Sequence, residues 1–313
     1  MGESAKWKKI GESSLSPTEK KERSEVKLKV ANKENIIVIG SEEHYSSFIL
    51  KMMFMAAATH KLNSGLRKAD NIVIACVTKG YTELELGVLE VYREKYGCEV
   101  VLIKSLSDLV SLLNRNRDDI KIQDLYIYSH GLPNLLTLNL DSAPDINISS
   151  GNLSKIKPDV FMSNGILHSY ACRTGVDANP YTPVDSYDND QGAKPETSLA
   201  MLMAKHFNIT VKAFLTRTFY GAVVRDSSQD ETIAEELNDL RKAGDSAVYP
   251  LLKGEYEALP HSGLSTGLRG WWSGVSDYAL WRNKGGRQAP VSGDTPKGLS
   301  RGAKQFKPDG TWS

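Results

Sequence analysis

The stretch "IQDLYIYSHG" at residues 122–131 is an apolar run that ends abruptly in a histidine and a glycine. Its aliphatic and aromatic side chains predict a strand that is buried on both faces, as strands of parallel sheets are. A second stretch, "NGILHSYACRTG" at residues 164–175, has the same form and leads to Cys172. Each stretch therefore predicts a buried strand that delivers a reactive side chain at its carboxyl end.

The rest of the chain continues an alternation of short aliphatic runs and longer amphipathic stretches. Such an alternation is typical of β-α-β units, so we predict an α/β fold with a mostly parallel sheet flanked by helices. Gly97 is expected to close one helix, and Ser105 or Ser107 to cap the next. Further strands are expected at residues 35–40, 71–78, 98–104 and 209–216, a small hairpin arm at 135–140, and helices at 45–62, 83–97, 105–117 and 196–207.

Composition divides the chain into three segments. Residues 1–33 are polar and lysine-rich, which predicts a flexible N-terminal arm, and residues 34–220 carry the strand and helix pattern. Residues 221–313 predict an irregular C-terminal extension with one charged helix and a Gly/Trp-rich segment. Its clustered tryptophans predict packing against the sheet domain, with partner binding or an inhibitory arm as alternatives. These tryptophans are Trp271, Trp272 and Trp281.

Charge and cysteine content exclude several classes of function. A formal net charge of +1 gives no reason to expect nucleic acid as a partner. The three cysteines lack zinc-like spacing, so neither a metal nor another cofactor is expected. No run has the length of a membrane span, and the N-terminus lacks an apolar signal region. We expect a cytoplasmic protein, or one that a dedicated secretion system delivers.

His130 and Cys172 are suited to act together. Residues that follow neighbouring parallel strands meet at one rim of the sheet, even when they are 42 positions apart in sequence. An imidazole can take the proton of a thiol and later protonate a leaving amine, which is the chemistry of acyl transfer. Gly131 would let a substrate approach the backbone closely, and the amides of Gly131 and Cys172 could stabilise an oxyanion. For Cys172 alone, the alternative is a buried structural cysteine.

The two motifs, "YIYSHG" and "HSYACRTG", resemble those of the caspase-like (clan CD) cysteine peptidases, and the similarity extends over residues 35–220. The resemblance implies a Cys-His dyad with Cys172 as nucleophile, His130 as general acid and base, and Gly131 as oxyanion donor. The chain departs from the caspase signature Q-A-C-[RQG]-G, with Tyr170 in place of the glutamine and Thr174 inserted before the final glycine. The caspase preference for Asp is therefore not carried over.

The family builds its substrate pocket from the turn after the first strand, from residues around the cysteine, and from residues after the last strand. These positions hold Glu42, Glu43 and Asp177, which would favour a basic residue before the cut, because a desolvated cation requires an opposite charge. Arg217 would favour an acidic residue instead. We expect a basic preference, although the sequence leaves the sign open.

The first hypothesis is a cysteine endopeptidase that cleaves protein or peptide substrates, of the kind found among delivered toxin-type effectors. An inhibitor or immunity-type protein would be a further partner. The alternative is a catalytically silent caspase-like module that binds a protein partner. A nucleotide-binding α/β domain is a third interpretation, but the chain has no phosphate-binding glycine motif after its first strand.

Overall fold

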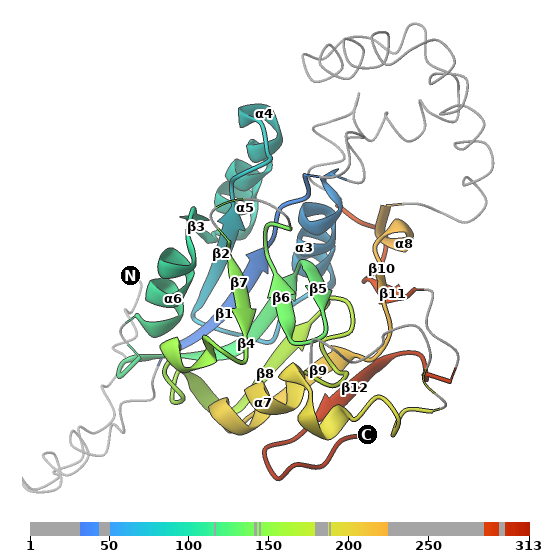
Figure 1. Cartoon of the computed structure of the whole chain (residues 1–313). Coiled ribbons are helices and arrows are strands. Elements are labelled where there is room, and N and C mark those ends of the chain that lie inside the picture. Colours follow the sequence, from blue (N-terminus) through green and yellow to red (C-terminus); the bar gives the residue numbers. More distant parts are fainter. Residues whose placement is uncertain are drawn as a thin grey trace, which may run out of the picture. The chain divides into compact units, whose positions relative to one another are not determined.

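The protein is described here by a computed structural model that covers residues 32–43, 51–115, 117–140, 143, 145–178, 187, 189–224, 285–293 and 298–313. Its centre is a seven-stranded sheet in the order β12-β9-β8-β4-β1-β2-β3 (Figure 1). All neighbouring strands are parallel except the pair of β12 and β9. The strands are β1 (Asn32–Ile39), β2 (Asn71–Val77), β3 (Glu99–Ile103), β4 (Ile120–Tyr128), β8 (Phe161–Ser169), β9 (Thr210–Phe214) and β12 (Ala303–Phe306).

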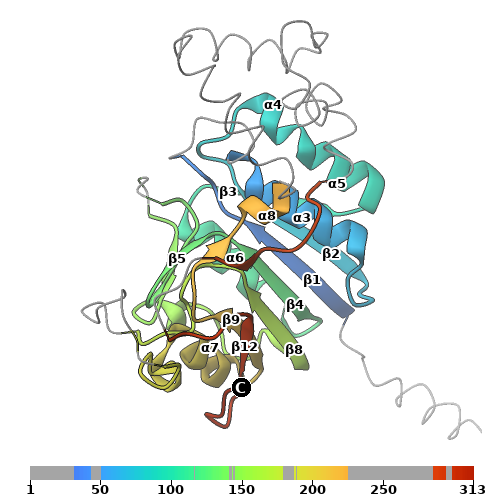
Figure 2. The ribbon, with the colours of Figure 1, turned by 90° about the vertical axis from the view of Figure 1, so that its right-hand side faces the viewer.

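Four helices cover the two faces of this sheet in the described part of the chain. Helices α3 (Met53–Ser64) and α5 (Val88–Tyr96) pack on one face, while α6 (Leu106–Asn114) and α7 (Leu199–Phe207) pack on the other (Figure 2). The predicted α/β class with a mostly parallel, helix-flanked sheet is thereby confirmed. The arrangement is consistent with a caspase-like fold.

The side chains of β1 explain why the sequences of the central strands are continuously apolar. Ile36 and Val38 belong to the core cluster under α6 and α7, whereas Ile37 and Ile39 belong to the cluster under α3 and α5. Because successive side chains of a strand point to opposite faces, a strand covered on both sides needs apolar residues at every position. The central sheet therefore lies between two hydrophobic cores.

Local sequence signals set the helix ends. Ser105 accepts a hydrogen bond from the amide of Asp108 and caps α6, as one of the two expected caps. Gly97 ends α5 in the left-handed conformation (φ 64°), which glycine adopts without strain. The single helix expected at residues 83–97 is divided at Gly87 into α4 (Glu83–Leu86) and α5. The helix expected from residue 196 begins as a 3₁₀ turn, η2 (Pro195–Thr197), and Ser198 caps α7.

Two small sheets flank the rim at the carboxyl ends of β4 and β8. The predicted hairpin arm is a three-stranded antiparallel sheet of β5 (His130–Leu132), β6 (Leu135–Thr137) and β7 (Asn147–Ser149). The other is a pair of β10 (Thr218–Phe219) and β11 (Val291–Ser292), which lies beside the short helix α8 (Gly221–Val224) (Figure 1).

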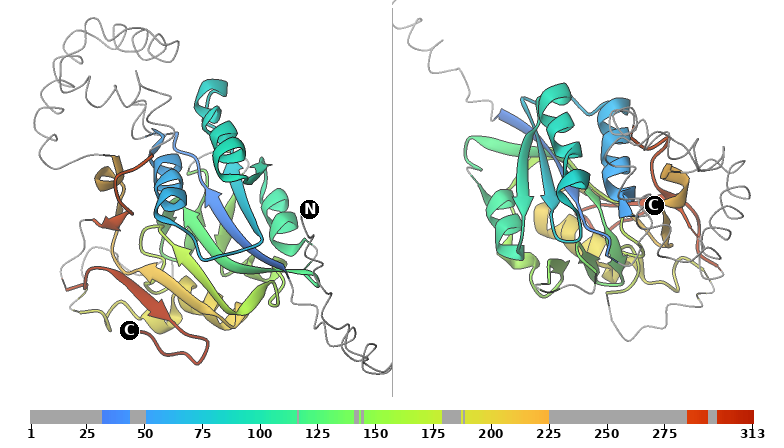
Figure 3. Two further views of the ribbon diagram at one scale, coloured as in Figure 1. Left: turned by 180° about the vertical axis from the view of Figure 1, so that it is seen from behind. Right: turned by 90° about the horizontal axis from the view of Figure 1, so that it is seen from above.

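The C-terminal segment requires a correction to the expected domain boundary at residue 220. Strand β12 pairs with β9 and completes the edge of the main sheet, which Figure 3 shows from behind. The ring of Phe306 is fully buried in the core, so these residues are part of the sheet domain. The sheet domain also begins slightly earlier than expected, since β1 starts at Asn32. The predicted charged helix, the three tryptophans and residues 1–31 of the N-terminal arm lie outside the described residues.

Candidate active site

His130 and Cys172 follow two adjacent parallel strands, in which the residues paired at the carboxyl ends are 42 positions apart in the sequence. Strands β4 and β8 are parallel, and Tyr126 pairs with His168. Their rings stack with centroids 4.4 Å apart, and the rings of Tyr128 and Tyr170 stack at 4.8 Å. The spacing between His130 and Cys172 equals this register, so the two residues leave their strands at the same level. The period of two also places them on the α3 side of the sheet.

The backbones of the two motifs are in direct contact. A Cβ atom added to Gly131 would lie 2.6 Å from the carbonyl oxygen of Cys172 and 2.9 Å from its nitrogen. It would also lie 2.7 Å from the Cβ atom of Ala171. Real side chains do not approach so closely, so only glycine fits at position 131. The structure thus brings the His-Gly and Ala-Cys motifs together at one rim.

The imidazole of His130 is held by a carboxylate that the sequence analysis had assigned to the substrate pocket. Nε2 of His130 is hydrogen-bonded to Oε2 of Glu42, whose side chain is fully buried, while that of His130 is 22% exposed. This contact assigns the Nε2 proton to the bond with Glu42 and leaves Nδ1 as the nitrogen for proton exchange. The rings of Phe54 and His130 pack edge to face, with their centroids 5.1 Å apart. The histidine is therefore fixed from two sides.

The turn after β1 carries Glu42 to this position. The amide of Gly40 donates to the Tyr128 carbonyl (2.8 Å), and the amide of Ser41 donates to the Leu138 carbonyl (2.7 Å). The Tyr81 hydroxyl donates to the Gly40 carbonyl at 2.9 Å. These bonds hold the turn after β1 against the carboxyl end of β4, so that the side chain of Glu42 reaches His130.

Cys172 lies in a tight turn that is tied to the segment after β9. Its Sγ atom accepts a hydrogen bond from the amide of Thr218 at 3.2 Å and lies 3.8 Å from the carbonyl oxygen of the same residue. Arg173, the next residue, has a left-handed backbone (φ 55°), and its amide donates to the Thr216 carbonyl at 2.9 Å. A bulky residue in that conformation costs about 1 kcal/mol, and such strain concentrates at functional sites.

The other two cysteines have the environment of structural residues. Cys76 and Cys98 are buried, whereas Cys172 is partly exposed. Burial raises the pKa of the Cys98 thiol to about 11 and raises the pKa of Cys76 further. Both remain protonated and inert at neutral pH. Cys172 is thus the accessible thiol of the chain.

His168, which lies on β8 four residues before Cys172, is partly buried. It stacks on Tyr126, and burial lowers its pKa to about 4. An imidazole with that pKa binds protons too weakly to serve as a general acid near neutral pH. His130 remains the candidate acid and base.

The structure distributes the remaining predicted pocket residues among different places. Glu43 is exposed and its side chain lies against Gly80, in the turn after β2. Asp177 is buried and accepts a hydrogen bond from the Thr197 hydroxyl at 3.0 Å, which ties the loop after Cys172 to η2. Arg217 is exposed at the start of β10. Of the expected acidic pocket, Glu42 contacts His130 directly.

Two buried hydroxyl groups at the rim have no hydrogen-bond partner among the described residues. They are Oγ of Ser41, next to Glu42, and Oγ1 of Thr218, whose backbone contacts Cys172. Buried polar groups are nearly always hydrogen-bonded, and exceptions concentrate where a ligand or water completes the site. Sequence patterns did not identify these residues, because neither stands in a motif.

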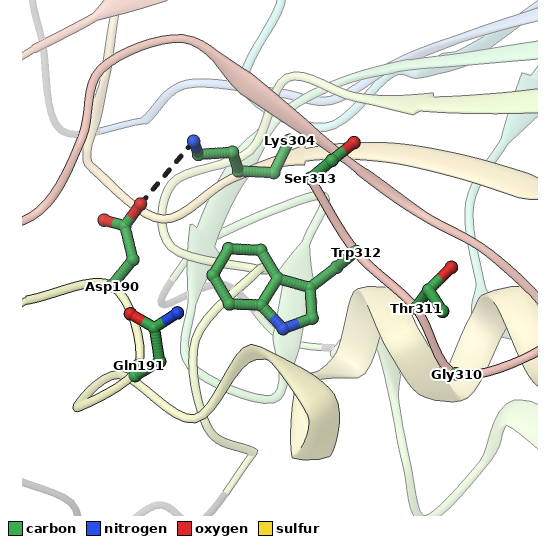
Figure 4. Close-up of a pocket in the computed structure, with 7 residues that line it drawn as sticks. All are labelled: Asp190, Gln191, Lys304, Gly310, Thr311, Trp312 and Ser313. Atoms are coloured by element: carbon green, nitrogen blue, oxygen red, sulfur yellow. Dashed lines mark ion pairs between the residues drawn. The ribbon is translucent and has the colours of Figure 1, made fainter.

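A separate shallow cavity of about 580 Å³ lies at the edge of the sheet (Figure 4). The indole of Trp312 lies beside Gln191 and below the side chain of Lys304, which is ion-paired with Asp190 (Figure 4). Burial alone would raise the pKa of Asp190, but hydrogen bonds from Ser300 and the charge of Lys304 hold it below its usual value. The charge of Asp190 is thus paired with that of Lys304, and the lining of the cavity includes neither His130 nor Cys172. The lining residues are Asp190, Gln191, Lys304, Gly310, Thr311, Trp312 and Ser313.

Comparisons with protein-family models, with curated proteins and with solved structures return no match for this chain. Among the described helices, none combines the length and the apolar character that crossing a bilayer requires. The same described residues contain no group of three or more His, Cys, Asp or Glu side chains placed to hold a metal ion.

Proposed function

We propose that this protein is a caspase-like cysteine endopeptidase in which Cys172 attacks the substrate carbonyl and His130 transfers the proton. One observation carries the proposal: the His-Gly motif packs against the Ala-Cys motif, and a buried carboxylate holds the histidine. A structural cysteine and a structural histidine would need neither this contact nor the exposure that both side chains retain.

The chemistry proceeds in two halves. Nδ1 of His130 takes the proton of the Cys172 thiol, and the thiolate forms a bond to the carbonyl carbon of the scissile peptide. The imidazolium then gives its proton to the leaving amine as the C–N bond breaks, which leaves an acyl-enzyme. A water molecule, deprotonated by His130, hydrolyses the thioester and restores the thiol. Glu42 orients the imidazole through its hydrogen bond to Nε2, as the carboxylate of a catalytic triad does.

The oxyanion that forms in each half needs hydrogen-bond donors at the rim. We assign this role to the amides of Gly131 and Cys172, whose backbones are in contact. Removal of one such donor costs an enzyme about 10²- to 10³-fold in kcat. Because Gly131 lacks a side chain, its backbone can lie directly against that of Cys172, which keeps the two amides close together.

The preference for a basic residue before the cut is part of the proposal, with Glu43 as the exposed carboxylate near the rim. The contact of Glu42 with His130 weakens this preference, because one of the acidic pocket residues serves the imidazole instead. Arg217, also exposed, would select the opposite charge. A library that contains both basic and acidic residues at each position distinguishes the two.

The test is cleavage of a mixed fluorogenic peptide library by the full chain and by two cysteine variants. Cys172→Ala should lower the cleavage rate by at least about 10³-fold, since the nucleophile is lost. Cys98→Ala, which removes a buried thiol, is the matched control and should cleave at close to the wild-type rate. Equal cleavage rates for the wild type and Cys172→Ala would refute the proposed role of Cys172 as the nucleophile of a peptidase.

A catalytically silent interaction module remains the second candidate, because β11 already covers one edge of the strand that touches Cys172. That candidate predicts no cleavage in any variant and partner binding that does not depend on the thiol.

A further inference from the structure

The strand β10 has two edges, and one of them faces the proposed nucleophile. Both the amide and the carbonyl of Thr218 point at Sγ of Cys172. In a strand, the N–H and C=O groups of one residue point to one side and those of the next residue to the other side. Arg217 and Phe219 therefore present their backbone groups at the edge of β10 opposite to the sulfur.

A segment of the same chain, Val291–Gly293, lies along that opposite edge. It runs antiparallel to β10, with Ser292 paired to Thr218 and Val291 paired to Phe219 (Figure 3). The amide of Gly293 donates to the carbonyl of Arg217 at 2.8 Å. An extended stretch of chain thus occupies the backbone groups that β10 would offer to another strand.

The segment is oriented towards the turn that carries Cys172. Gly293 lies at the Arg217 end of β10, and the neighbouring carbonyl, that of Thr216, is bonded to the amide of Arg173. Residues 291 to 293 therefore run in the direction that brings each successive residue closer to the Cys172 turn. A peptide in this place would lead its next carbonyl towards the thiol.

We propose that Val291–Gly293 is a cover that occupies the outer edge of β10 in the resting protein and competes there with an extended peptide substrate. This inference rests on the proposed peptidase function and adds to it a means of regulation. Strand addition provides main-chain hydrogen bonds for any peptide sequence. The segment must leave before a substrate can pair with β10.

The cover is weak in itself but tethered at both ends. Its two paired apolar side chains, Phe219 and Val291, are 48% and 41% exposed, and a two-stranded ribbon is marginally stable in water. On one side, the amide of Gly286 donates to the Ala56 carbonyl on α3 at 2.8 Å. On the other, the amide of Gly302 donates to the Ser292 hydroxyl at 2.8 Å. Tethering keeps the local concentration of the segment high, so a weak pairing competes with substrate.

The decisive variant is Gly293→Pro, because proline lacks the N–H group that donates to Arg217. Ser292→Pro is the matched control, since the Ser292 amide points away from β10. It also removes the hydroxyl that accepts from Gly302, so Ser292→Ala measures that loss separately. The full chain of each variant is assayed for kcat/KM on the fluorogenic library. We expect Gly293→Pro to raise kcat/KM about two- to tenfold over both controls, as the loss of one hydrogen bond implies.

A binding assay decides the inference independently of catalysis. A labelled synthetic peptide with the sequence of residues 287–293 is titrated by fluorescence anisotropy against full-length Cys172→Ala, with and without Gly293→Pro. Tighter binding to the double variant, abolished by a scrambled peptide, supports the proposal. Unchanged kcat/KM together with unchanged affinity overturns it. If no variant cleaves while the peptide still binds the uncovered edge, the peptidase function fails and the peptide site stands.

Discussion

Glu42 and His130 are 88 residues apart in sequence, and the structure joins them through a hydrogen bond between a buried carboxylate and Nε2 of the imidazole. In the proposed peptidase this bond leaves Nδ1 as the nitrogen that exchanges a proton with Cys172.

Glu42→Gln should lower kcat about 10- to 100-fold with little change in KM, since the amide keeps the size of the side chain but loses its charge. Glu43→Gln is the matched comparison, because Glu43 is the exposed neighbour and its side chain lies against Gly80. Steady-state kinetics of the two variants would contradict the role of Glu42 if both reduced kcat to the same extent.

Gly131→Ala should impair both stability and cleavage, because its Cβ atom would overlap the backbone of Cys172. We expect a loss of about 1–3 kcal/mol in the free energy of unfolding, as overpacked sites show. Gly151→Ala provides the comparison, since the nearest atom to a Cβ there, the Ser149 hydroxyl, is 3.7 Å away. Chemical denaturation of both variants measures the difference, and equal stability would argue against the tight contact.

Iodoacetamide should modify Cys172 alone in the folded protein at pH 7.5. Burial holds Cys98 in the thiol form with a pKa of about 11, and Cys76 is buried more deeply. Peptide mass spectrometry after a short exposure should find one labelled cysteine, and after denaturation three. Rapid labelling of Cys98 in the native state would contradict the assigned environment.

His168 should make the protein less stable in mild acid. Its folded pKa of about 4 lies below the value of 6.5 for an exposed histidine, so the unfolded chain binds more protons between these values. The contribution of neutral His168 to the free energy of unfolding is present above pH 6.5 and is lost progressively as the pH falls towards 4. At pH 5 the loss is about 2 kcal/mol. His168→Phe should be free of this loss. Denaturation of both proteins at pH 7 and pH 5 gives the comparison, and parallel losses would exclude His168 as the cause.

Phe306→Ala should destabilise the whole sheet domain by about 3–5 kcal/mol, the cost of removing a fully buried aromatic ring. The exposed neighbour Gln305→Ala should have a much smaller effect. If β12 were a dispensable appendage, thermal unfolding of the two variants would coincide.

The ends of β4 and β8 could be predicted from the sequence, because in each case a run of apolar residues is followed closely by a reactive side chain. His130 and Cys172 were placed at one rim on this basis, and the register of β4 and β8 explains the placement. The expected caps at Ser105 and Gly97 are likewise local signals, which depend on a few neighbouring residues.

The remaining features depend on contacts that no local pattern encodes. Glu42 reaches His130 because hydrogen bonds fold the turn after β1 over β4, so its assignment to the pocket followed from position alone. Strand β12 has only four residues with mixed polarity, and its pairing with β9 is settled by the burial of Phe306. Asp177 stands in a polar loop of the sequence, but in the structure its carboxylate accepts a hydrogen bond from the Thr197 hydroxyl and ties that loop to η2.

The pairing of β9 with β12 has a consequence for how the protein is made. Strand β9 ends at Phe214 and its edge partner begins at Ala303, so a ribosome adds 88 further residues between them. At about 5–20 residues per second, this interval lasts roughly 4–18 seconds. Throughout it, the nascent chain exposes an unpaired strand edge, which chaperones have to shield from neighbouring chains.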